Sequence, residues 1–118
     1  GKGVNDALKR AKAYSKAGAD AIVIHSKEKK PNEIFAFSKK FQKSKYLKPL
    51  IAVPSTYSKT YERDLVKNGF KIVIYANHFL RAAHLATKKV AKSILTNQRS
   101  FESEKYIDSI KEILSLIK

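Results

Sequence analysis

The sequence predicts an α/β fold in which short strands and helices alternate along the chain. Three short, largely apolar runs rich in β-branched residues begin near residues 20, 49 and 71. Such runs are typical of strands buried on both faces of a parallel sheet. Each run is followed by apolar residues at the spacing of an amphipathic helix. This alternation implies parallel strands joined by right-handed helical crossovers.

The predicted elements follow one another in the order α-βα-βα-βα-α. The first helix covers residues 4–17 and ends at Gly18, because glycine commonly stops a helix. The remaining elements are a strand at 20–25, a helix at 31–43, a strand at 49–53, a helix at 59–68, a strand at 71–75, a long helix from about 78 to 96 and a last helix at 102–117. The last helix is expected to bury Tyr106, Ile107, Ile110, Ile113, Leu114 and Ile117.

The strand spacing favours a partial (β/α)8 barrel of the TIM type over a small open sheet. Eight strand–helix units of roughly 30 residues make a barrel of the usual ~250 residues. A flavodoxin-like sheet normally needs five strands, whereas this chain of 118 residues offers three. Three strands cannot close a barrel. We therefore expect residues 1–118 to be the C-terminal part of a single barrel domain, with an extra helix at the end, or to associate with other copies.

Composition favours a solvated basic surface over a nucleic-acid interface, and the absence of cysteine fits a cytoplasmic protein. The net charge is +15, but 21 of the 25 basic residues are lysine, and only Arg10, Arg63, Arg81 and Arg99 are arginine. Arginine provides the planar donor fork that reads phosphates and bases. A basic nucleic-acid-binding or assembly module is the alternative of another class. With no cysteine there is no disulfide or thiolate metal site, and no apolar run approaches the ~18 residues of a membrane span.

Polar side chains follow all three predicted strands. They form the pairs His25-Ser26, Ser55-Thr56 and Asn77-His78. Ligands of parallel α/β folds bind outside the carboxyl ends of the strands. The pairs are therefore candidates for one binding site, and His25 is its leading member, as a donor or cation facing an oxyanion or as a general acid–base.

Each candidate also has a structural explanation. A strand-end histidine such as His25 can be satisfied by a backbone group, and Ser26 is evenly balanced between a structural and a binding role. Ser55 is expected to cap the next helix and Thr56 to line the pocket. Asn77 is expected to act mainly as the N-cap of the long helix, worth about 1 kcal/mol, although it could also present its amide to substrate. No carboxylate cluster suitable for Mg²⁺ is visible.

Several stretches resemble the phosphoenolpyruvate mutase family of the isocitrate lyase superfamily. The resemblance begins in the first predicted helix and is most specific at Ala17-Gly-Ala-Asp-Ala-Ile-Val-Ile-His-Ser26. It continues through Val53-Pro-Ser-Thr56 and Val73-Ile-Tyr-Ala-Asn-His78, and it covers nearly the whole chain. One departure is the extra serine in Val53-Pro-Ser-Thr56, which leaves Ser55 and Thr56 as alternatives for one family position.

The resemblance implies a barrel of which this chain supplies about strands six to eight. It implies an enzyme that interconverts phosphoenolpyruvate and phosphonopyruvate, forming a carbon–phosphorus bond for phosphonate biosynthesis, with phosphonopyruvate hydrolase as the alternative inside the family. His25, Ser26, Thr56 and Asn77 would bind substrate. Mg²⁺ would be held by residues upstream of this chain, so the 118 residues alone should be inactive. The enzyme would form homo-oligomers, for which an exchanged C-terminal helix is one route.

Overall fold

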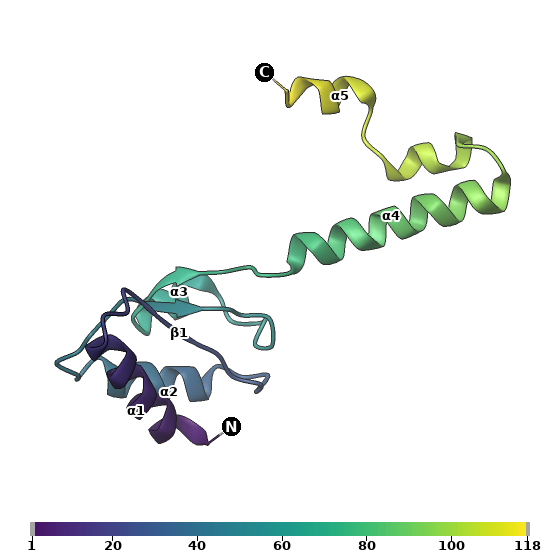
Figure 1. The fold of residues 1–118 in the computed structure, drawn as a ribbon. Helices are drawn as coiled ribbons and strands as arrows, with labels where there is room; N and C mark the ends of the chain where they lie inside the picture. The colour runs from purple at the N-terminus through teal and green to yellow at the C-terminus, as the bar shows by residue number, and fades with distance from the viewer. Residues whose placement is uncertain (1, 118) are drawn as a thin grey trace. The chain divides into compact units, whose positions relative to one another are not determined.

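The computed structural model describes residues 2–117, which divide into two compact units at the Ala76–Asn77 junction. The first unit is an α/β unit in which all three strands are parallel (Figure 1). Its elements are α1 (Gly3–Lys16), β1 (Ile22–Ile24), α2 (Asn32–Phe41), β2 (Leu50–Ala52), α3 (Glu62–Lys67) and β3 (Phe70–Val73). All six predicted elements of this unit are confirmed, although the strands and α3 are shorter than expected.

The three strands lie in sequence order, β1–β2–β3, so each crossover joins neighbouring strands. Ile22 is opposite Leu50, and Ile24 is opposite Ala52. Between β2 and β3 the register shifts by one residue, since Leu50 is opposite Phe70 whereas Ile51 is opposite Ile72. The shift keeps Phe70 on the same face as Leu50. The carboxyl ends of the strands therefore share one edge of the sheet.

The hydrophobic core lies between the sheet and its helices. Its buried members come from α1, α2, α3, all three strands and the loop after β2, and the rings of Phe37 and Phe41 stack with their centroids 5.5 Å apart. Figure 1 shows α1 and α2 side by side, and the two helices contact each other. The buried members are Ala11, Ile22, Ile34, Phe37, Phe41, Leu50, Ala52, Tyr57, Leu65 and Phe70.

Within residues 2–117 the strands are buried on one face and not on both, which is consistent with three strands that cannot close a barrel. Alternate strand residues point to opposite faces of a sheet, and here one set is exposed: Val23 is 56% exposed, Ile72 46% and Ile74 41%. The core receives the other set, which includes Ile22, Leu50 and Phe70. The described helices therefore cover one apolar face of the sheet and leave the other exposed.

A polar contact fastens α2 to the end of α3. The buried Ser38 hydroxyl donates to the Asn68 carbonyl, and the Gln42 amide donates to the same carbonyl (3.1 Å) and to Ser38 Oγ (3.0 Å). Gly69 follows with φ +86°, and a Cβ atom at this position would lie 1.9 Å from Gln42 Nε2. The positive φ favours glycine here, and a side chain would also displace the Gln42 amide.

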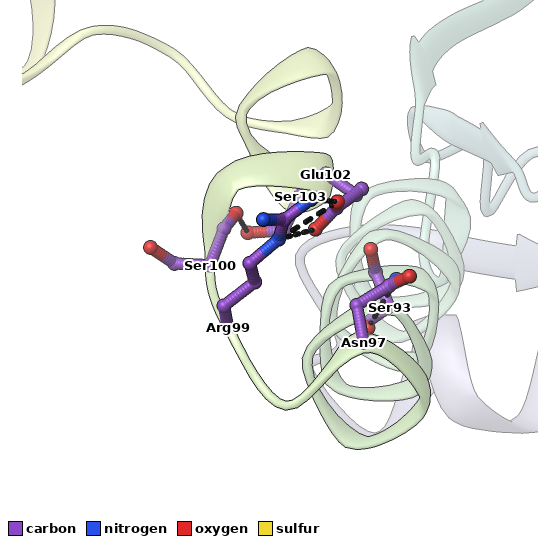
Figure 2. Close-up of polar contacts among 6 residues, drawn as sticks. All are labelled: Ser93, Asn97, Arg99, Ser100, Glu102 and Ser103. Carbon is purple, nitrogen blue, oxygen red and sulfur yellow. Dashed lines mark hydrogen bonds and ion pairs between the residues drawn. The ribbon is translucent and has the colours of Figure 1, made fainter.

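The second unit contains α4 (His78–Asn97), the 3-10 helix η1 (Phe101–Tyr106) and α5 (Ile110–Ser115). The α4 helix ends where Gln98 adopts a left-handed conformation with φ 53°. Figure 2 shows the turn that follows, in which Arg99 pairs with Glu102 and the Ser103 hydroxyl donates to the Ser100 carbonyl (2.6 Å). These contacts turn the chain back so that η1 contacts α4. None of the helices within residues 2–117 is long and apolar enough to cross a membrane.

The prediction of one continuous last helix over 102–117 is wrong. Ile107 is extended (φ −132°, ψ 153°), which interrupts the helix. A new helix starts at Ser109, whose hydroxyl accepts from the Glu112 N–H while the Glu112 carboxylate accepts from the Ser109 N–H, forming a capping box. The apolar residues expected to be buried are exposed, from Tyr106 at 41% to Ile110 at 78%. The described residues of this unit therefore supply no core for the apolar spacing, and the capping box starts a separate helix at Ser109.

We predict that Gly69→Ala destabilises the first unit more than Gly18→Ala does. Both glycines have positive φ, which costs a side chain about 1 kcal/mol. Gly18 has open space around it, whereas alanine at Gly69 would also displace Gln42. Urea unfolding of both variants measures the difference in the free energy of unfolding. Equal losses in the two variants would show that the contact with Gln42 adds nothing.

Candidate functional site

The loop after β1 begins with His25, which is exposed, and Ser26, which is buried. The Ser26 hydroxyl donates to the carboxylate of Glu33, in the first turn of α2, and accepts from the Glu28 N–H (3.1 Å). The hydroxyl proton of Ser26 is therefore directed to Glu33. This geometry gives Ser26 a firm structural role at the site.

Thr56 connects the loops after β1 and β2. Its hydroxyl donates to the Ser26 carbonyl at 2.6 Å, across 30 positions of sequence. The sequence placed His25, Ser26 and Thr56 at one end of the sheet, and the structure brings them together there. Ser55, by contrast, does not cap α3 as expected, because that helix starts at Glu62 and its N-cap residue is Tyr61.

Tyr57 lies next to His25, with the ring centroids 6.1 Å apart and the rings tilted by 41°. It is fully buried, and its hydroxyl accepts from the Val53 N–H at 3.2 Å. Burial raises the pKa of Tyr57 above the usual 10.0, with the Val53 hydrogen bond acting in the opposite direction. Tyr57 thus forms a neutral, fixed wall beside the histidine. Sequence reasoning missed both Tyr57 and Glu33, since neither directly follows a strand.

A hollow of about 400 Å³ opens beside His25, between α1, the end of β1 and α2. Basic groups at its lining are Lys2, Arg10 and Lys27, and the acidic ones are Glu28 and Glu33. Arg10 is paired with Asp6 (2.9 Å), which raises the pKa of the guanidinium above its usual value. The remaining lining residues are Gly3, Val4, Ala7, Ile24, His25, Ser26, Ile34 and Phe37. The lining therefore carries charged groups of both signs beside apolar side chains.

Asn77 starts the second unit. It occupies the N-cap position of α4 as expected, but its side chain makes no capping hydrogen bond, so the predicted capping contribution is wrong. The backbone at Asn77 (φ −136°, ψ 4°) lies outside the extended region that N-cap residues typically adopt. Asn77 Oδ1 is buried and has no hydrogen-bond partner within residues 2–117. Its amide oxygen is therefore available to a group outside these residues.

The described residues offer no metal site. Within residues 2–117, no group of three or more His, Cys, Asp or Glu side chains could hold a metal ion. Ion pairs and hydrogen bonds already engage several of the acids, as at Asp6, Glu33 and Glu102. The residues described by the structure therefore do not fit Mg²⁺.

A family profile described as "Phosphoenolpyruvate phosphomutase" matches residues 1–95. The chain belongs to the phosphoenolpyruvate phosphomutase family. The match includes β1, β2, β3 and the loops that carry His25, Ser26 and Thr56. The resemblance seen in the sequence is thereby confirmed.

Curated relatives agree with this family. A phosphoenolpyruvate phosphomutase of Tetrahymena pyriformis is 40% identical over 116 residues, which are 98% of this chain and 38% of the relative. A phosphonopyruvate hydrolase of Variovorax sp. (strain Pal2) is also 40% identical, over 98% of this chain and 39% of its own length. The chain thus spans less than two fifths of the length of these relatives.

Solved structures of the family share the fold. A phosphoenolpyruvate phosphomutase from Streptomyces platensis subsp. rosaceus superimposes with a TM-score of 0.86 at 34% identity, covering 98% of this chain and 39% of the other. A phosphonopyruvate hydrolase in complex with oxalate and Mg²⁺ superimposes with a TM-score of 0.82 at 40% identity, covering 97% of this chain and 40% of the other.

We predict that Tyr57→Phe destabilises the protein at neutral pH and that this loss shrinks above pH 10. Removing the hydroxyl leaves the Val53 N–H without its acceptor, which costs about 1–3 kcal/mol. Because burial raises the Tyr57 pKa, the unfolded chain loses the phenolic proton first as pH rises. The wild type therefore loses stability above the unfolded pKa, and Tyr57→Phe does not lose this contribution.

Denaturant unfolding at pH 7 and above pH 10 measures the effect. Tyr61→Phe is the control, because Tyr61 is 64% exposed. A stability difference between wild type and Tyr57→Phe that is the same at both pH values would contradict the prediction.

Proposed function

We propose that this chain is the C-terminal part of an enzyme that interconverts phosphoenolpyruvate and phosphonopyruvate. The observation that carries the proposal is the position of His25, at the carboxyl end of β1 beside a hollow with basic residues, in a chain of this family. In parallel α/β folds the ligand binds at this edge. The whole enzyme would act in the cytoplasm.

In the proposed reaction the phosphoryl group moves from oxygen to carbon within one molecule. The bond between phosphorus and the enol oxygen breaks, a bond between phosphorus and C3 forms, and the enol oxygen becomes the ketone. His25 would donate to the phosphoryl oxygens as their charge shifts, since charge-assisted donors stabilise such oxygens. Asn77 would present its amide to substrate. Ser26 and Thr56 would contribute to substrate binding mainly because their hydrogen bonds fix the loop beside His25.

We further propose that the sheet is part of a (β/α)8 barrel. The exposed side chains of Val23, Ile72 and Ile74 would then face the barrel interior, which is filled by branched apolar residues in this architecture. The other strands of the barrel would pair with the outer edges of β1 and β3. Mg²⁺ would be held by residues outside this chain.

We also propose that the whole enzyme forms homo-oligomers. Apolar side chains in the second unit are largely exposed, among them Ile110 (78%), Leu114 (60%) and Ile117 (76%). Contiguous exposed apolar surface commonly marks a protein contact. An exchange of the C-terminal helix with another subunit would cover these residues.

Phosphonopyruvate hydrolysis is the second candidate. The hydrolase of Variovorax sp. is as similar to this chain as the Tetrahymena phosphomutase, at 40% identity each. In hydrolysis the carbon–phosphorus bond is broken by water, which gives pyruvate and inorganic phosphate. Both reactions would use His25 to hold the same phosphorus-bound oxygens.

The product formed from phosphonopyruvate distinguishes the two reactions. We expect the whole enzyme, with Mg²⁺, to produce phosphoenolpyruvate, detected by phosphorus NMR. Inorganic phosphate as the direct product would favour the hydrolase instead. The 118-residue chain alone is the control, and we expect no turnover from it, because its described residues contain no metal site.

We predict that His25→Gln lowers kcat/KM of the whole enzyme by about a hundredfold, the usual effect of removing one charge-stabilising donor. His84→Gln is the matched control, because His84 lies exposed in the middle of α4. Steady-state kinetics with phosphonopyruvate measures both variants. Equal activity in His25→Gln and the wild type would remove His25 from the reaction.

A further inference from the structure

The peptide that follows His25 is fixed from two directions. On one side the Ser26 hydroxyl donates to the Glu33 carboxylate, at the start of α2. On the other the Ser26 carbonyl accepts from the Thr56 hydroxyl at 2.6 Å. Ser26 is 5% exposed, whereas Glu33 and Thr56 are exposed, so two surface side chains hold a buried residue. His25, next to this anchored residue, has limited freedom at its backbone.

Glu33 is the member of this network that the mechanism does not use. Its carboxylate accepts a hydrogen bond from the Ser26 hydroxyl. Ser26 Oγ is then oriented to accept from the Glu28 N–H (3.1 Å). One carboxylate thereby fixes both the side chain of Ser26 and the turn of the loop at Glu28. A neutral, apolar residue at position 33 would free the Ser26 hydroxyl to rotate and weaken the turn.

We propose that Glu33 is a positioning residue for His25. It acts through Ser26, whose bonds to Glu33 and Thr56 hold the loop after β1 against α2 and against the loop after β2. Tyr57, 6.1 Å from the His25 ring, supports the imidazole from the β2 loop. Glu33 would thus contribute to the reaction without touching substrate. This inference rests on the proposed function, in which His25 holds the phosphorus-bound oxygens.

The first test needs no activity. In the 118-residue chain, Glu33→Ala should increase the hydrogen-exchange rate of the Glu28 amide by roughly tenfold, because its acceptor, Ser26 Oγ, is no longer held. The Ile22 amide, bonded to the Pro49 carbonyl at 2.9 Å, reports on global stability and should be unchanged. An unchanged Glu28 amide would overturn the inference. Glu33→Leu removes the acceptor while keeping a bulky side chain in α2, and it replaces Glu33→Ala if that variant does not fold.

The second test separates positioning from simple stabilisation. In the whole enzyme, Glu33→Ala and Ser26→Ala should each lower kcat roughly tenfold or more, since a small misplacement of a reacting group is costly. The double variant should be no slower than the slower single variant, because both remove one interaction. Glu104→Gln is the charge-matched control, since Glu104 is exposed in η1 and its carboxylate bonds to no residue within the described part of the chain. It should leave kcat unchanged.

Combining Glu33→Ala with His25→Gln tests whether Glu33 acts through His25. If Glu33 positions His25, adding Glu33→Ala to His25→Gln should lower kcat no further. A further tenfold loss in that background, or a normal kcat in Glu33→Ala with a lowered melting temperature, would overturn the inference. Failure of the proposed function has a different signature, because His25→Gln alone would then keep full activity.

Discussion

The packing of α1, α2 and α3 against one face of the sheet is the constraint on which the rest of the first unit depends. Phe37, Phe41, Leu50 and Phe70 are each at most 1% exposed, and they come from α2 and two different strands. Burying such side chains contributes about 1.5–3 kcal/mol each. This packing fixes the positions of the strands relative to α2. The loop after β2 can therefore hydrogen-bond to the loop after β1, as Thr56 does to Ser26.

The polar network at the site is a direct consequence of this arrangement. Thr56 reaches Ser26 only because β1 and β2 are parallel neighbours, with Ile24 opposite Ala52. Glu33 reaches Ser26 because a short loop returns the chain to the start of α2, over the same core. Parallel strands bring residues far apart in sequence to one edge of the sheet, and loops at this edge commonly carry function.

The fold of the first unit was predictable from the sequence because local and long-range signals agree there. Apolar runs such as 20–25 mark the strands, and Gly18 and Gly69 mark helix ends. The same reasoning failed at 102–117, where the helical spacing of Ile110, Ile113 and Ile117 implied burial that no neighbouring element supplies. His25, Ser26 and Thr56 were predictable as neighbours from strand order alone. The partners Glu33 and Tyr57 were not, since they depend on side-chain geometry within loops.

Two features of the first unit have a single physical explanation in the proposed barrel. Within residues 2–117, β1 and β3 each pair with one strand, so each has an edge of unpaired backbone groups, which is normally a liability. The exposed face with Val23 and Ile72 adds apolar surface that a soluble sheet would not leave open. Pairing both edges within a closed barrel would cover the edges and the face together. An added layer of helices would cover the face but leave the edges unpaired. Closure into a barrel accounts for both the edges and the face.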